Sequence, residues 1–138
     1  MKSKDDSAAA AKRRCQQECK GRCCRYITIA IPAPKRKVDF DELGWFLAHR
    51  NISIYVEARR WHVEVQNRCK HLGKNNLCTA YGNRPGVCRD YEADSCEYPV
   101  RPVHTLHFES REAFDSWRAQ RTLTQQDRRR ARASAAGR

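Results

Sequence analysis

Cysteine is the residue type that dominates the chemistry available to this sequence. Eight cysteines fall into two groups, one within residues 15–24 and one within residues 69–96. The groups consist of Cys15, Cys19, Cys23 and Cys24, and of Cys69, Cys78, Cys88 and Cys96. Thiolate sulfur binds Zn²⁺ or iron–sulfur clusters in preference to Mg²⁺ or Ca²⁺. Four thiols per group match two four-thiolate sites, or one site shared by both groups with sulfurs to spare.

The two groups differ in spacing. In the first, the separations of four residues from Cys15 to Cys19 and on to Cys23 would align three sulfurs on one face of a helix. Gly21 disfavours a helix, so a turn is equally compatible. The second group lacks the tight Cys-x2-Cys pairs of zinc fingers and is rich in Gly, Asn and Pro, which predicts loops.

Disulfide bonding is the alternative use of eight cysteines. Residues 1–14 are polar and charged, so we expect no secretory signal peptide, and no apolar run approaches the ~18 residues that span a bilayer. We therefore expect a cytoplasmic protein without a membrane partner, where cysteines bind metal more often than they form disulfides. A secreted domain with four disulfides remains open, although the adjacent Cys23 and Cys24 suit it only if they pair with different partners.

Positive charge is concentrated at the two ends of the chain. The formal net charge is +12, of which residues 1–14 carry +3 and residues 122–138 carry +4. We expect both ends to be disordered basic tails around a single domain of residues 15–121. The tails could bind nucleic acid or an acidic protein, although no aromatic residues alternate with the arginines of the C-terminal tail to stack on bases.

The sequence around the cysteines predicts a small α+β domain. It has a short antiparallel sheet, two helices and cysteine-rich loops. Residues 25–31 are rich in β-branched side chains and predict a strand. Residues 52–56 and 61–65 alternate with period two across a short link and predict a hairpin. Its expected buried set is Ile52, Ile54, Val56, Trp61, Val63 and Val65. His62 is expected on the solvated face of that hairpin.

Two helices and a further strand complete the prediction. Asp39 is expected to cap a helix over residues 40–50. Ser110 is expected to cap a helix from Arg111 to about Arg121, with Phe114 and Trp117 on its buried edge. Residues 103–108 predict a short strand, in which His104 and His107 would point to opposite faces because they are three residues apart.

The segment CTAYGNRPGVCRDY, residues 78–91, resembles the C-x2-Y-x2-R-P-x2-C-R-x-[FY] pattern of the YkgJ-type cysteine-cluster family of zinc- or iron-chelating domains. Cys69, Cys96 and the early cluster ending in Cys23-Cys24 fit the same pattern, so the resemblance covers about residues 15–117. It implies a metal-chelating protein. The family's early motif is C-x2-C-x2-C-C, whereas both gaps here are three residues, which weakens the assignment of Cys15 first and of Cys19 next.

Several side chains beside the cysteines have two possible roles. Arg84 and Arg89 could donate hydrogen bonds to thiolates or sulfides of a bound cluster, or could pair with Asp90 or Glu92 at the surface. Tyr81 is expected to pack against the cluster. His71, two residues after Cys69, is the histidine best placed to join a metal site.

Two further functions remain open beside metal chelation. A related cysteine segment occurs in flagellin lysine methylases, so one alternative is a metal-cluster-dependent enzyme related to protein lysine methylases. No glycine-rich nucleotide-binding loop supports that activity, and the catalytic residues are unassigned. The other is a basic nucleic-acid-binding adaptor with structural zinc.

Overall fold

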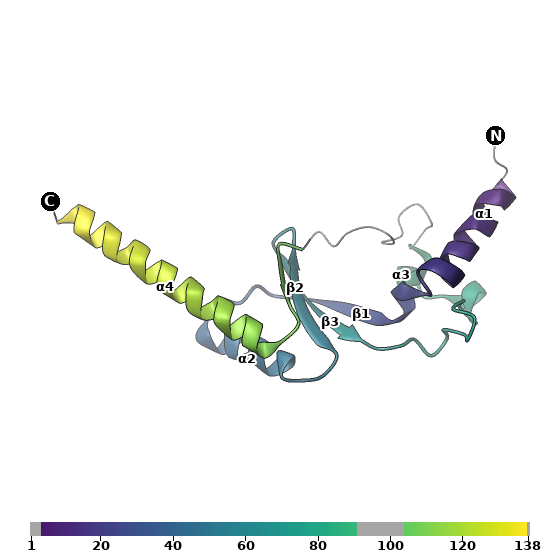
Figure 1. Cartoon of the computed structure of the whole chain (residues 1–138), viewed down its shortest axis with the longest axis horizontal. Helices are drawn as coiled ribbons and strands as arrows, with labels where there is room; N and C mark the ends of the chain where they lie inside the picture. The colour runs from purple at the N-terminus through teal and green to yellow at the C-terminus, as the bar shows by residue number, and fades with distance from the viewer. Residues whose placement is uncertain (1–3, 91–103, 138) are drawn as a thin grey trace. The chain divides into compact units, whose positions relative to one another are not determined.

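The computed structural model describes residues 4–90 and 104–137 (Figure 1). The strands are β1 (Tyr26–Ile31), β2 (Ile52–Glu57), β3 (Arg60–Gln66) and β4 (Leu106–Phe108). The helices are α1 (Lys4–Arg13), α2 (Lys37–Leu47), α3 (Gly86–Arg89) and α4 (Arg111–Ala136). Shorter helical turns are η1 (Arg14–Glu18), η2 (Arg22–Cys24) and η3 (Tyr81–Asn83). The strand order β1-β3-β2-β4 confirms the predicted α+β class.

The chain divides into two compact units. The cysteine unit comprises Met1–Thr28 and Glu64–Val103, and the sheet unit comprises Ile29–Val63 and His104–Arg138. All seven described cysteines belong to the cysteine unit. The predicted domain limits at residues 15 and 121 stay a prediction.

The sheet unit is built on the predicted hairpin. β2 and β3 are joined by Ala58 and Arg59, which both have positive φ, of 47° and 67°. Positive φ at both central residues is the geometry of the two-residue turn whose twist matches that of paired strands. β4 pairs antiparallel to β2, with Ile54 opposite Phe108. The predicted strand at residues 25–31 is confirmed as β1.

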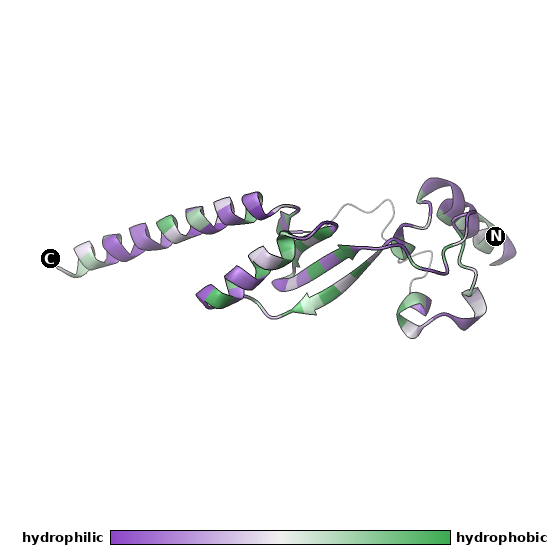
Figure 2. Cartoon of the chain, turned by 90° about the horizontal axis from the view of Figure 1, so that it is seen from below, coloured by the Kyte–Doolittle hydropathy of each residue, from purple (hydrophilic) through white to green (hydrophobic). Residues whose placement is uncertain are grey.

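One face of the hairpin forms the core with α2 and α4. Strand residues Ile54, Val56, Trp61 and Val63 are buried there as predicted, whereas Ile52 and Val65 are only half-buried because they lie near the strand ends. The helices add Leu43, Leu47 and Phe114, and β4 adds Phe108. Figure 2 shows this apolar colouring on the strands and on α2. Aliphatic and aromatic burial of this kind is the main force that holds a small sheet together.

The start of α2 differs from the prediction. Asp39 is not the N-cap but the third residue of the helix, and the N-cap is Arg36, with φ −102° and ψ 162°. The Asp39 carboxylate accepts hydrogen bonds from the backbone N–H of Arg36 at 2.8 Å and of Lys35 at 3.0 Å. It therefore satisfies donors just before the helix, as the third residue of a capping box does.

The last helix is longer than predicted. Ser110 caps it, since its Oγ accepts a hydrogen bond from the N–H of Ala113 at 3.2 Å, and Phe114 is fully buried. The expected end near Arg121 is wrong, because α4 continues to Ala136. Residues 122–136 contain neither Gly nor Pro and are rich in Ala, Gln and Arg, which are good helix formers. Residues 4–13 also form a helix, α1.

The opposite face of the hairpin carries a cluster of aromatic rings. His62 is half-buried rather than solvated, with its ring stacked on Tyr55 at a centroid distance of 4.8 Å. The His104 ring stacks on Tyr55 at 4.3 Å and meets His107 at 5.1 Å. The prediction that His104 and His107 point to opposite faces is wrong, because strand alternation begins only at Leu106.

Candidate metal centre

Seven cysteines of the cysteine unit lie within the described residues, and all seven are free thiols. Cys23 and Cys69 are exposed, and the others are half-buried: Cys15, Cys19, Cys24, Cys78 and Cys88. Cys96 lies outside the described residues, as do Glu92 and the rest of the segment around it. No disulfide joins any two of the seven described cysteines, which leaves their sulfurs available as ligands.

The first cysteine segment is a broken helix. Cys15 lies in η1 and Cys19 follows it, with its thiol donating a hydrogen bond to the carbonyl of Cys15 at 3.6 Å. Lys20 and Gly21 then have left-handed φ values of 54° and 66°, which stop the helix. η2 follows and carries Cys23 and Cys24. Of the two predicted alternatives, the turn is therefore found.

The second segment presents two of its cysteines on a short loop. The N–H of Gly73 donates to the carbonyl of Leu77 at 2.8 Å, and the N–H of Thr79 donates to the carbonyl of His71 at 2.8 Å. Leu72 and Cys78 form an antiparallel bridge between the two arms. Cys69 and Cys78 consequently lie near the two ends of this loop, and Cys88 follows on α3.

Backbone hydrogen bonds join the two segments directly. The N–H of Cys69 donates to the carbonyl of Cys24 at 2.7 Å, and the N–H of Asn67 donates to the carbonyl of Arg25 at 2.9 Å. These bonds run between neighbouring stretches of chain that are more than 40 residues apart in sequence. They place the end of the first cysteine segment beside the start of the second.

Arg25 and Asn76 add a side-chain link that the sequence analysis did not identify. The Arg25 guanidinium donates to the carbonyl of Lys20 at 2.9 Å and to Oδ1 of Asn76 at 3.0 Å. The Asn76 amide in turn donates to the carbonyl of Gln16 at 3.1 Å. Nothing in the spacing of these residues marks them, because the link is made only after the chain has folded.

Gly21 and Leu72 pack against each other between the segments. Leu72 is buried with 5% of its surface exposed. A Cβ atom at Gly21 would lie 2.7 Å from Cδ1 of Leu72 and 3.2 Å from the carbonyl oxygen of Asn76. The glycine is therefore required both for its left-handed backbone and for the close approach of the loop.

The electrostatics of the thiols shows which cysteines are neighbours. Cys23 is exposed as a residue, but neighbouring protein atoms shield part of its thiol from solvent, and this burial raises its pKa to about 12. The nearby Cys24, and then Cys15 and Cys19, raise the pKa of Cys23 further. Thiolates placed close together repel one another, so each neighbour makes deprotonation harder.

Cys24 connects the first cysteine segment to the second. Burial raises the pKa of its thiol, a hydrogen bond from Cys23 lowers it, and the neighbouring sulfurs of the second segment raise it. Those neighbours are Cys69, Cys78 and Cys88. All seven described thiols are therefore within electrostatic range of Cys23 or Cys24, which makes this pair the centre of the arrangement.

The donor chemistry fits a soft metal, but the side chains are not arranged as a formed site. Among residues 4–90 and 104–137, no three Cys, His, Asp or Glu side chains are grouped so that they could hold a metal ion. Zinc binds thiolate sulfur at about 2.3 Å in a tetrahedron. Binding by the described cysteines thus requires their sulfurs to come closer together than they lie here.

The side chains predicted beside the cysteines mostly contact the backbone. The Arg84 guanidinium lies 3.7 Å over the ring of Tyr81 and donates to the carbonyls of Tyr81 at 3.0 Å and Cys88 at 3.3 Å. Arg84 thus closes the turn that leads into Cys88. Tyr81 is 67% exposed, so the expectation that it packs against the cysteine cluster is wrong. Arg89 is exposed and ends α3.

His71 approaches Cys69 through its backbone. Its N–H donates to Sγ of Cys69 at 3.4 Å, while the residue itself is exposed. The structure thus gives His71 a backbone contact with the Cys69 sulfur.

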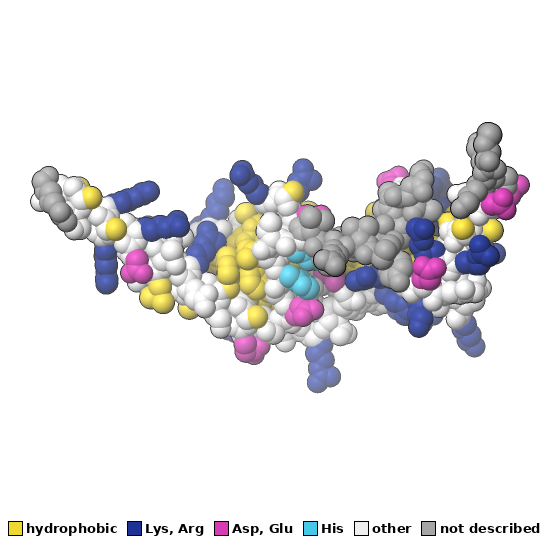
Figure 3. Space-filling view, turned by 45° about the horizontal axis from the view of Figure 1, so that its top comes forward, with side chains coloured by type: hydrophobic (Ala, Val, Ile, Leu, Met, Phe, Trp, Pro, Cys, Tyr) yellow, Lys and Arg dark blue, Asp and Glu magenta, His cyan; other side chains and the backbone are white. Residues whose placement is uncertain are grey.

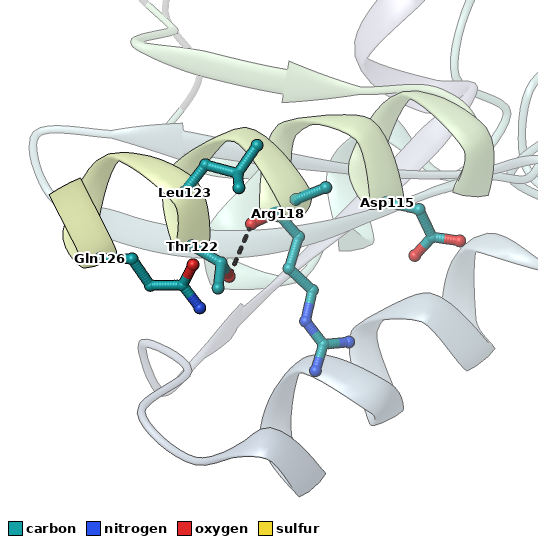
Figure 4. A pocket seen from close by; sticks show the side chains of 6 residues that line it. Asp115, Arg118, Thr122, Leu123 and Gln126 are labelled. Atoms are coloured by element: carbon teal, nitrogen blue, oxygen red, sulfur yellow. Dashed lines mark hydrogen bonds between the residues drawn. The ribbon is translucent and has the colours of Figure 1, made fainter.

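A shallow cavity elsewhere has no metal-binding character. It lies on α4 in the sheet unit and has a volume of about 440 Å³ (Figure 4). Its lining residues are Asp115, Arg118, Ala119, Thr122, Leu123 and Gln126. It contains no cysteine or histidine, so the cysteine unit remains the candidate metal centre.

Comparison with known proteins gives one family match. The family model CxxCxxCC, described as a "putative zinc- or iron-chelating domain", matches residues 14–121. No curated protein and no solved structure matches the chain. No described helix has the length and apolar character needed to cross a membrane.

Proposed function

Because the chain belongs to the CxxCxxCC family of zinc- or iron-chelating domains, we propose that it binds zinc or an iron–sulfur cluster through thiolates of residues 15–24 and 69–96. The ligands are drawn from Cys15, Cys19, Cys23, Cys24, Cys69, Cys78, Cys88 and Cys96. The observation that carries this proposal is the position of Cys24, whose thiol has neighbouring thiols in both segments.

The bound metal acts first as a cross-link. The cysteine unit has little apolar interior among its described residues, where Leu72 is the one buried aliphatic side chain. A structural zinc site can contribute about 10 kcal/mol or more to folding. Positive charge at the centre also relieves the repulsion that the clustered thiolates exert on one another.

The residues around the cysteines hold the ligands in place. Arg25 and Asn76 connect the two segments, and Arg84 fixes the turn before Cys88 through that residue's carbonyl. We assign Arg84 and Arg89 to the surroundings of the centre, where their positive charge favours anionic sulfur. Free thiols require a reducing compartment, which favours the cytoplasm.

Elemental analysis of anaerobically purified protein, together with acid-labile sulfide, tests the proposal. A colourless protein with bound zinc and no sulfide establishes a zinc site. A brown protein with visible absorption, iron and sulfide establishes an iron–sulfur cluster. Protein without metal whose thiols fail to react with Ellman's reagent would contradict the proposal and indicate disulfides instead.

A further inference from the structure

Most arginines of α4 lie on one side of the helix, whereas Arg130 lies on the opposite side. At 3.6 residues per turn, Arg118, Arg121, Arg128, Arg129 and Arg132 fall within an arc of about 100°. We call these five residues the arginine stripe. The acidic Asp127 lies about 150° from the middle of that arc. Figure 3 shows Lys and Arg side chains standing out along this helix.

The stripe begins where α4 is anchored. The Arg118 guanidinium donates to the Asp41 carboxylate at 2.9 Å. The Arg121 guanidinium lies 5.4 Å over the ring of Trp117 and 5.8 Å over that of Phe40. These contacts attach the near end of the stripe to α2 and fix the direction in which the basic face points.

The far end of the stripe is free to meet a partner. Arg128, Arg129 and Arg132 are exposed, and in the described part of the chain no ion pair neutralises them. The exposed stretch of residues 119–136 is about 27 Å long at 1.5 Å per residue. A long, exposed helix face that carries several arginines and no acidic side chain is complementary to a polyanion.

We propose that the arginine stripe binds duplex DNA through its backbone phosphates, in addition to the metal-binding function of the cysteine unit. The major groove of B-form DNA is about 12 Å wide and accepts an α-helix, whereas that of A-form RNA is too deep and narrow. Arginine contacts to phosphates attract the protein without reading the base sequence. Binding is therefore independent of sequence and strongly dependent on salt.

The test is fluorescence anisotropy of the metal-loaded, full-length protein with a labelled duplex of about 20 bp, two helical turns, at about 50–200 mM salt. The variant R129Q/R132Q removes two arginines of the stripe. The matched control K12Q/R13Q removes the same charge from exposed positions of α1. The charge-preserving variant R129K/R132K tests whether charge alone is required.

We expect R129Q/R132Q to weaken binding at least tenfold and to reduce the slope of log K against log salt by about 2, one unit for each lost phosphate contact. K12Q/R13Q and R129K/R132K should stay within about threefold of the wild type. Absence of DNA binding at low salt, or equal losses for both glutamine variants, overturns the proposal. The proposal is also overturned if poly-glutamate displaces the labelled duplex as effectively as unlabelled DNA does, because that result indicates an acidic protein partner. The metal content of each variant is measured as well. Failure of the DNA-binding proposal and failure of the metal-binding proposal can then be distinguished.

Discussion

The guanidinium of Arg25 donates a hydrogen bond to Oδ1 of Asn76 at 3.0 Å, across 51 positions of the sequence. The same guanidinium donates a hydrogen bond to the carbonyl of Lys20, and the Asn76 amide donates one to the carbonyl of Gln16. The pair therefore connects both sides of the first cysteine segment to the loop between Cys69 and Cys78. It joins the two groups of proposed cysteine ligands without being a proposed ligand itself.

Replacing Arg25 should loosen this connection. We expect Arg25→Ala to lower the free energy of unfolding by about 1–3 kcal/mol, because a charged donor is lost and Asn76 keeps an unpaired oxygen. It should also speed the loss of metal to a chelator. Thermal unfolding and release of metal to a coloured chelator measure the two effects. Arg22→Ala removes an exposed arginine from η2 and is the control; equal effects of both variants would contradict the role of Arg25.

Substitution of Gly21 should be costly for two separate reasons. The left-handed φ of 66° penalises any side chain by about 1–2 kcal/mol, and a Cβ atom there meets Leu72 at 2.7 Å. We therefore expect Gly21→Ala to lower stability and metal content together. Gly82→Ala is the matched control, since a Cβ atom there has nothing within 4 Å. Chemical unfolding of both variants gives the comparison, and a neutral Gly21→Ala would show that the loop relaxes freely.

Cys24 should matter more for metal affinity than Cys15. The thiol of Cys24 has neighbours in the second segment, at Cys69, Cys78 and Cys88, whereas Cys15 is placed close to Cys23 within its own segment. We expect Cys24→Ser to weaken metal binding by at least about 100-fold, more than the loss of a supporting hydrogen bond does. Competition titrations with a chelator measure it, with Cys15→Ser as the companion variant. A greater loss for Cys15→Ser would place the centre elsewhere.

The contribution of Asp39 to stability should depend on pH. Hydrogen bonds from the backbone of Arg36 and Lys35, and then from the Arg36 side chain, lower the pKa of Asp39 from 3.8 to about 2. A carboxyl group whose pKa is lower in the folded state stabilises the fold above its unfolded pKa. That stabilisation is present above pH 3.8 and is lost as the pH falls through about 2.

Asp39→Asn removes this charge and keeps the shape of the side chain. We expect the variant to be less stable than the wild type at neutral pH and the difference to shrink between pH 3.8 and about 2. Urea unfolding of both proteins across this pH range measures the difference. Effects of acid on the thiols cancel in it, because the wild type and the variant have the same cysteines. Glu42→Gln, on the same helix and exposed, is the control. A difference that stays constant with pH would show that the charge of Asp39 is not involved.

Local patterns predicted most of the sheet unit correctly. Alternation identified the hairpin of β2 and β3, and Ser110 marked the start of α4, because both signals depend on neighbours within a few residues. The errors came where a local rule was applied beyond its range. The alternation of a strand was assumed to include His104, which lies before the start of β4. The Arg-rich residues after Arg121 were expected to be disordered, whereas they continue α4.

The sequence alone determined the kind of chemistry this protein can perform. Two groups of four cysteines define a soft donor set wherever they lie, because ligand preference belongs to the sulfur atom. Only the tertiary structure decided which thiols are neighbours. The electrostatic interaction between Cys24 and Cys78, and the hydrogen bond between Arg25 and Asn76, arise when segments separated by about 50 residues are brought together. Such contacts depend on the path of the whole chain, and no spacing within either segment specifies them.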